Sequence, residues 1–124
     1  GGGDSPRILM SFSYLASPYS HPDSSVRERR YVAVKAATAK LLARKVWVFS
    51  PIVHCHELAK VCDLPRDSSF WEKYNFVMLG AAEYLYQLMI PGWHESIGCK
   101  AEWEEAKRLG IPVIQYEPKE HILS

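Results

Sequence analysis

The sequence lacks the features of several protein classes that bind large partners. Its 124 residues carry a formal net charge of +1, so nothing favours electrostatic capture of a nucleic-acid polymer or a membrane surface. No apolar run approaches the length of a transmembrane helix. The first residues lack the charged and apolar regions of a signal peptide. We therefore expect no membrane and no nucleic-acid polymer among its partners.

Cysteine is scarce as well. The three cysteines, Cys55, Cys62 and Cys99, are an odd number without paired spacing, which predicts reduced thiols and a cytoplasmic protein. The run His54-Cys55-His56 has the composition of a metal-binding cluster. Adjacent residues cannot easily converge on one ion, however, and no second ligand pair accompanies them. We therefore expect no metal site at these residues.

Three motifs of nucleotide and ester chemistry are missing. The sequence contains neither the Gly-x-Gly-x-x-Gly motif of dinucleotide-binding folds nor the phosphate-binding Gly-x-x-x-x-Gly-Lys-Ser/Thr loop. The Gly-x-Ser-x-Gly elbow of common esterases is also absent. These absences disfavour the corresponding enzyme classes, and we expect no cofactor.

Apolar residues, in contrast, are abundant at 48%, which indicates a globular protein. The length fits one domain with a real core, and we assign residues 7–124 to it. Residues 1–6 are expected to be a disordered segment or a remnant of expression. The tail after Pro118 is expected to be peripheral.

Strand-like and helix-like patterns alternate along the chain. Such alternation predicts an α/β fold with a parallel sheet and helices on both faces. Ligands of such sheets bind outside the carboxyl ends of the strands. The predicted strands cover residues 7–16, 45–50, 84–90 and 111–116, and the predicted helices cover residues 25–44, 54–61, 69–82 and 96–109.

Short polar patterns mark where these helices begin. Ser25-x-x-Glu28 and Ser69-x-x-Glu72 have the form of capping boxes. Ser96 can cap the last long helix, which a Gly-Ile-Pro run then ends. The loops at residues 17–21, 51–56 and 93–98 each follow a predicted strand. We therefore expect them to meet at one crevice, at the carboxyl ends of the strands.

The helix at residues 96–109 places one carboxylate, Glu102, within an apolar stripe. A buried carboxylate is unfavourable unless it is partnered or protonated, so its pKa should be raised. Either Glu102 bends out to solvent, or it is held in a cleft for chemistry. Glu104 lies off the stripe and can pair with Arg108. The stripe consists of Cys99, Glu102, Ala106 and Leu109.

Two further polar residues lie on apolar helix faces. Arg30 could point into the crevice, or its stem could pack while its head reaches water. Asn75 could contact a ligand or satisfy a backbone group. At the start of the last helix, Ser96-x-Gly98 can bind a phosphate or a sugar hydroxyl. A nearby carboxylate such as Glu102 suits attack on an oxocarbenium-like sugar centre.

Several of these motifs occur together in one known family. They are Tyr-Leu-Ala-Ser-Pro-Tyr at 14–19, Phe-Ser-Pro-Ile at 49–52, and Pro-Gly-Trp at 91–93 followed by Ser96-x-Gly98-x-x-x-Glu102. Over residues 8–116, the chain resembles the nucleoside 2-deoxyribosyltransferase superfamily and its small N-glycosidase-like members. The resemblance implies a flavodoxin-like or Rossmann-like sheet of four or five strands. It also implies hydrolysis or transfer at the N-glycosidic bond of a nucleoside or nucleoside 5′-monophosphate.

The resemblance assigns roles to individual residues. It implies that Glu102 is the nucleophile that attacks the anomeric carbon, and that Ser17 and Ser96 hold the 5′ end of the substrate. Tyr19 occupies the position of a phosphate-binding arginine in the nucleotide glycosidases, and Arg30 could replace that arginine. Asn75 stands where the family has an aspartate that contacts or protonates the leaving base.

The resemblance further implies that Trp93 and Gly98 contribute to substrate binding. It also implies a homodimer or homotetramer, because family members form their active sites at subunit contacts. An amide such as Asn75 cannot donate a proton as an acid. Glu72, His94 and Glu95 are nearby candidates for that role. The alternative function is a catalytically weak nucleotide-binding or sensing protein with the same cleft.

Overall fold

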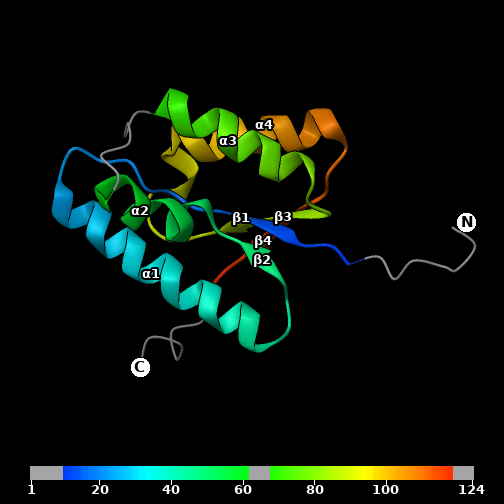
Figure 1. Ribbon diagram of the computed structural model, residues 1–124, viewed down its shortest axis with the longest axis horizontal. Helices are drawn as coiled ribbons and strands as arrows, with labels where there is room; N and C mark the ends of the chain where they lie inside the picture. Colours follow the sequence, from blue (N-terminus) through cyan, green and yellow to red (C-terminus); the bar gives the residue numbers. More distant parts are fainter. Residues whose placement is uncertain (1–9, 62–67, 119–124) are drawn as a thin grey trace, which may run out of the picture.

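A computed structural model gives the structure of the protein, and it describes residues 10–61 and 68–118. One sheet of four parallel strands has the order β2-β1-β3-β4 (Figure 1). The strands are β1 (Ser13–Ala16), β2 (Val48–Phe49), β3 (Tyr84–Leu88) and β4 (Val113–Tyr116). The helices are α1 (Ser24–Ala43), α2 (Pro51–Val61), α3 (Ser68–Gly80), the 3-10 helix η1 (Trp93–Glu95) and α4 (Ile97–Leu109).

The strand order creates a switch point between β1 and β3. From β1 the chain passes through α1 to β2 at one edge, then crosses back through α2 and α3 to β3 on the other side of β1. Tyr14 lies in register with Phe49 on one side and with Leu85 on the other. In doubly wound sheets, the carboxyl ends of strands at such a point form the ligand crevice.

The helices cover the sheet in two layers. In Figure 1, α1 lies below the sheet with α2 beside it at the left, while α3 and α4 lie above the sheet. Side chains alternate along β1, so Leu15 packs in the α1 layer while Tyr14 and Ala16 pack in the α3 and α4 layer. The same alternation on β3 puts Leu88 with α1 and Leu85 with α3 and α4.

The predicted α/β fold, with a four-stranded parallel sheet and helices on both faces, is confirmed, but several boundaries are wrong. Within the described residues, β1 and β2 are shorter than predicted because pairing is limited to Ser13–Ala16 and Val48–Phe49. Helix α2 begins at Pro51 rather than His54. Proline is pre-organised for the first helical position, and the Ser50 hydroxyl accepts the Val53 N–H at 3.2 Å, as a cap does.

The capping predictions have mixed outcomes. Asp23, not Ser25, caps α1: its side chain accepts the Ser25 N–H at 2.8 Å, so the predicted capping box at Ser25 is wrong. Ser96 caps α4 as predicted and accepts the Cys99 N–H at 3.1 Å. Gly110 ends α4 in the left-handed conformation, with φ 75°.

The end of α3 and an ion pair on α4 also differ from the predictions. Helix α3 ends at Gly80, two residues before the predicted end. Arg108 pairs with Glu105 at 2.7 Å, so the predicted Glu104–Arg108 pair is wrong. Residues three positions apart, such as Glu105 and Arg108, are also neighbours on a helix surface. The predictions for residues 1–6, the side chain of Ser69 and the tail after Pro118 lie outside what the structure describes.

None of the helices in the described ranges has the length and apolar character needed to span a bilayer. Within residues 10–61 and 68–118, no three His, Cys, Asp or Glu side chains come together as a metal site would require.

Candidate active site

The inner face of α4 carries a buried carboxylate. Glu102 is 8% exposed and lies on the same face as Cys99 and Ala106. One of its oxygens accepts a hydrogen bond from the Tyr14 hydroxyl on β1. The alternative that Glu102 bends out to solvent is therefore wrong. A carboxylate in this position is held between a helix and the central strand of the sheet.

The surroundings of Glu102 change its acidity. Burial raises its pKa from 4.5 to about 7, because the charged form loses its contact with water. The hydrogen bond from Tyr14 lowers the pKa, and the nearby Glu72 carboxylate on α3 raises it. A group with a pKa near neutrality can act as a nucleophile or exchange a proton at the pH of a cell.

Tyr14 is the partner that sequence reasoning did not assign to the site. Its ring is fully buried, and burial together with the Glu102 charge raises the pKa of its hydroxyl, so it is a neutral donor. A signal was present, since Tyr14 opens the 14–19 motif and carries a polar hydroxyl on a strand that is expected to be buried. Its partner lies 88 residues away in the chain, which no local pattern reveals.

Two predicted residues hold buried oxygens that lack a hydrogen-bond partner among the described residues. They are the Oγ of Ser17, directly after β1, and the Oδ1 of Asn75 on α3. Buried polar atoms are nearly always paired with protein, water or a ligand. Ser17 itself is 7% exposed. A bound molecule at the carboxyl end of β1 would give such atoms partners.

Arg30 joins two loops at this end of the sheet. Its Nη1 donates to the backbone oxygen of Ser20 at 2.9 Å, in the loop after β1. Its guanidinium also lies directly against Gly92, in the loop after β3. Gly92 has φ 94°, and a Cβ there would collide with the Arg30 Nη2. Half-buried Arg30 thus places its head group between the loops that follow β1 and β3.

Tyr19 turns toward α2. Its hydroxyl and the Nδ1 of His56 are 2.6 Å apart, and the opposite nitrogen of His56 lies 3.5 Å from the Glu28 carboxylate. The His56 ring stacks on Tyr31 with centroids 3.9 Å apart. Burial lowers the pKa of His56, which favours the neutral ring. Tyr19 is therefore part of a packed cluster between α1 and α2.

The start of α4 forms one wall of a cavity of about 260 Å³. The Ser96 hydroxyl and the Trp93 indole line it, and Trp93 stacks on Trp103 with ring centroids 6.1 Å apart. Gly98 is exposed in the first turn of α4, where a Cβ would make only ordinary contact with Ser96. Thus Trp93 and Ser96 share one cavity.

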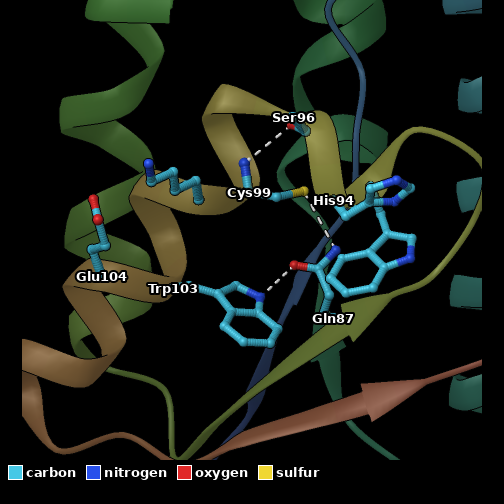
Figure 2. Close-up of a pocket in the computed structure, with 8 residues that line it drawn as sticks. Gln87, His94, Ser96, Cys99, Trp103 and Glu104 are labelled. Atoms are coloured by element: carbon cyan, nitrogen blue, oxygen red, sulfur yellow. Dashed lines mark hydrogen bonds between the residues drawn. The ribbon is translucent and has the colours of Figure 1, made fainter.

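Gln87 on β3 is a further polar residue that sequence reasoning missed. It is fully buried, and its Oε1 accepts the Trp103 indole N–H at 2.6 Å. Its amide nitrogen donates to the backbone oxygen of Ala16 at 3.3 Å and contacts the Cys99 sulfur at 3.4 Å. Figure 2 shows this amide between Cys99 and Trp103 at the base of the cavity. Gln87 therefore ties the carboxyl end of β1 to α4.

The predicted residues fall into two neighbouring groups. Glu102 points toward Tyr14, whereas the cavity lined by Ser96 and Trp93 lies along the next side-chain row of α4 and does not include Glu102. Burial raises the pKa of the Cys99 thiol, which lies between the two groups, to about 11. This thiol stays protonated near neutral pH, which leaves Glu102 as the nucleophile candidate of the pair.

Comparison with known families gives one match. The family described as Domain of unknown function (DUF1937) matches residues 11–118, so the chain belongs to this family. No curated protein sequence matches the chain.

Proposed function

We propose that this member of the DUF1937 family cleaves the N-glycosidic bond of a nucleoside or nucleoside 5′-monophosphate, by hydrolysis or by transfer to a second base. Glu102 is the nucleophile. The observation that carries the proposal is a buried carboxylate, held by the Tyr14 hydroxyl above the central strand, whose pKa is raised to about 7. Such a group suits attack on a sugar carbon that develops positive charge.

The surroundings supply the other needs of this chemistry. The buried Ser17 Oγ and Asn75 Oδ1 offer hydrogen bonds to a sugar or a base. Arg30 provides a positive charge between the loops that follow β1 and β3. The cap of α4 at Ser96 presents backbone N–H groups, which suit the 5′ end of a nucleotide. We further propose that the protein acts in the cytoplasm as a homodimer or homotetramer.

The test is a panel of nucleosides and their 5′-monophosphates, with release of free base as the readout. We expect Glu102→Ala to abolish release while the protein stays folded. Glu105→Ala is the matched control, because this carboxylate lies on the same helix and pairs with Arg108 instead. Base release that survives Glu102→Ala at the wild-type rate would contradict the assignment.

The pH profile tests the same residue independently. The nucleophile must be ionised, and the pKa of Glu102 is raised to about 7. Activity should therefore fall as the pH drops below about 7, well above the range where an ordinary glutamate titrates. A profile that is flat down to pH 5 would argue against Glu102 as the nucleophile.

A second function is favoured by one residue. Asn75 carries an amide, which can bind a base but cannot protonate it. The same cleft would then belong to a nucleotide-binding or sensing protein with little turnover. A nucleotide that raises the melting temperature while no base appears over hours would support this alternative over the first.

A further inference from the structure

We propose that His54, held by Tyr74, protonates the departing base and is thus a second catalytic residue. The inference rests on the proposed function, because it concerns the leaving group of that reaction. Its structural basis is a row of side-chain contacts that leads from Glu102, across the end of the sheet, to the rim between α2 and α3.

The reaction requires an acid at this position. When the glycosidic bond breaks, its electron pair moves to a nitrogen of the base, which leaves poorly unless it is protonated. Asn75 cannot serve, because an amide is not an acid. Glu72 on α3 is exposed, and its proximity raises the pKa of Glu102. An imidazole on another element that borders the same space would meet this need.

Aromatic contacts connect Glu102 with His54. The ring of Tyr14, which binds Glu102, lies 6.1 Å from the ring of Phe49 at the end of β2. Phe49 in turn lies 5.5 Å from the imidazole of His54, in the first turn of α2. Two ring contacts therefore separate the imidazole from the phenol that holds the nucleophile. The proposal places the base of a sugar bound at Glu102 on this side of the crevice.

Tyr74 fixes the imidazole from the opposite layer. Its hydroxyl and the Nε2 of His54 are 2.9 Å apart, and the two rings stack with centroids 5.6 Å apart at an angle of 14°. When the imidazole is protonated, Nε2–H donates to the phenol oxygen and Nδ1–H can face a ligand. His54 is exposed and Tyr74 is 40% exposed, so the pair borders solvent where a base could enter.

The other histidines that follow the strands fit this role less well. His21, in the exposed loop after β1, already accepts the Asp23 N–H through its Nδ1 at 3.0 Å. His56 is buried and already contacts Tyr19 and Glu28 through its two ring nitrogens. Burial also lowers the pKa of His56, which disfavours the protonated donor form. His94 lines the separate cavity at the start of α4, beside Trp93. His54 is the histidine whose contacts lead to Tyr14.

The proposed step balances in atoms and charge. An oxygen of Glu102 forms a bond to C1′ as the C1′–N bond breaks, and the bond's electron pair goes to the base nitrogen. His54 gives its proton to the base and becomes neutral. Water then attacks C1′, the bond to Glu102 breaks, and the carboxylate is restored. The proton released by the water returns to His54.

Two substrates with different leaving groups test this role. The first is a 2′-deoxynucleoside, which needs an acid, and the second is p-nitrophenyl 2-deoxyriboside, whose phenolate leaves without one. We expect His54→Gln to lower kcat/KM for the nucleoside by about 10²–10⁴-fold. The same variant should keep the value for the nitrophenyl substrate within about threefold of wild type. Tyr74→Phe should show the same selectivity with a smaller loss.

Controls separate this proposal from a structural role and from the proposed function. Glu57→Gln, on the exposed side of α2 where Glu57 pairs with Lys60, should leave both substrates unaffected. Equal losses on both substrates in His54→Gln and Tyr74→Phe would overturn the acid role, because packing does not distinguish leaving groups. If wild-type protein turns over neither substrate, the proposed function fails and this inference fails with it. Should His54→Gln not fold, Tyr74→Phe alone decides by its selectivity.

Discussion

The two faces of the sheet differ in what they bury. The face covered by α1 has a mostly aliphatic core that also contains the hydroxyls of Thr38 and Tyr116, whereas the face covered by α3 and α4 buries a carboxylate, Glu102, beside the polar groups of Tyr14 and Gln87. A layer without a buried charge stabilises the fold through the burial of its apolar surface. A layer with a carboxylate gives up stability, and such sites are where function is expected. The apolar face consists of Leu15, Val34, Ala37, Leu41, Leu88 and Ile90.

This comparison predicts the largest loss of stability on the apolar face. Leu88 is fully buried in the layer with α1, so Leu88→Ala removes buried methyl groups and leaves a cavity. We expect a decrease of about 2–5 kcal/mol in the free energy of unfolding. Urea denaturation followed by circular dichroism measures it. A decrease below about 1 kcal/mol would show that this face is not the main source of stability.

Removal of the buried carboxylate from the face covered by α3 and α4 should instead increase the stability of the protein. Because the pKa of Glu102 is raised from 4.5 to about 7, the folded state retains a proton that the unfolded state has lost. The contribution of Glu102 to stability should therefore be greatest below about pH 4.5 and should fall by about 3 kcal/mol as the pH rises to about 7. Glu102→Gln should remove this decrease and make the variant more stable than wild type above pH 7.

Glu105 provides the control for that experiment. Its pKa is lowered by the hydrogen bond from Arg108, and its half-buried carboxylate is paired with that residue rather than with Tyr14. Glu105→Gln should therefore leave the decline between pH 4.5 and 7 in place. Chemical denaturation at several pH values measures both variants. If Glu102→Gln retains the wild-type decline, the carboxylate is not the group responsible.

The smallest expected effect on stability concerns the backbone conformation at the C-terminal ends of α4 and α1, one helix from each layer. On the polar side, α4 ends at Gly110, where φ is 75° and the following N–H of Ile111 bonds to Ala106. On the apolar side, α1 ends in the same pattern, with Val46 N–H bonded to Leu41, but Lys45 adopts φ 64°. A left-handed conformation is unfavourable for lysine and easy for glycine.

Lys45→Gly should therefore stabilise the protein, by about 1 kcal/mol or less, because the gain is partly offset by the flexibility of glycine in the unfolded chain. The reverse change, Gly110→Ala, should destabilise it by about 1 kcal/mol. Thermal unfolding of both variants checks the pair. A destabilised Lys45→Gly variant would mean that the lysine side chain contributes more than its backbone strain removes.

Local patterns were sufficient for the fold and for part of the site. Helical spacing placed Glu102 on the apolar side of α4, and the cap at Ser96 followed from residue type and position. The Tyr14–Glu102 hydrogen bond and the role of Gln87 could not be predicted in this way. Both depend on which strand lies beneath α4, and that is decided by packing between segments distant in sequence.

The contact between Arg30 and Gly92 has a consequence for related sequences. The guanidinium occupies the space that any side chain at position 92 would need, and φ 94° already disfavours such a side chain. The two positions are therefore expected to vary as a pair among homologues. A chain that replaces the glycine should also carry a shorter residue in place of the arginine, and its loops after β1 and β3 would then be joined by some other contact.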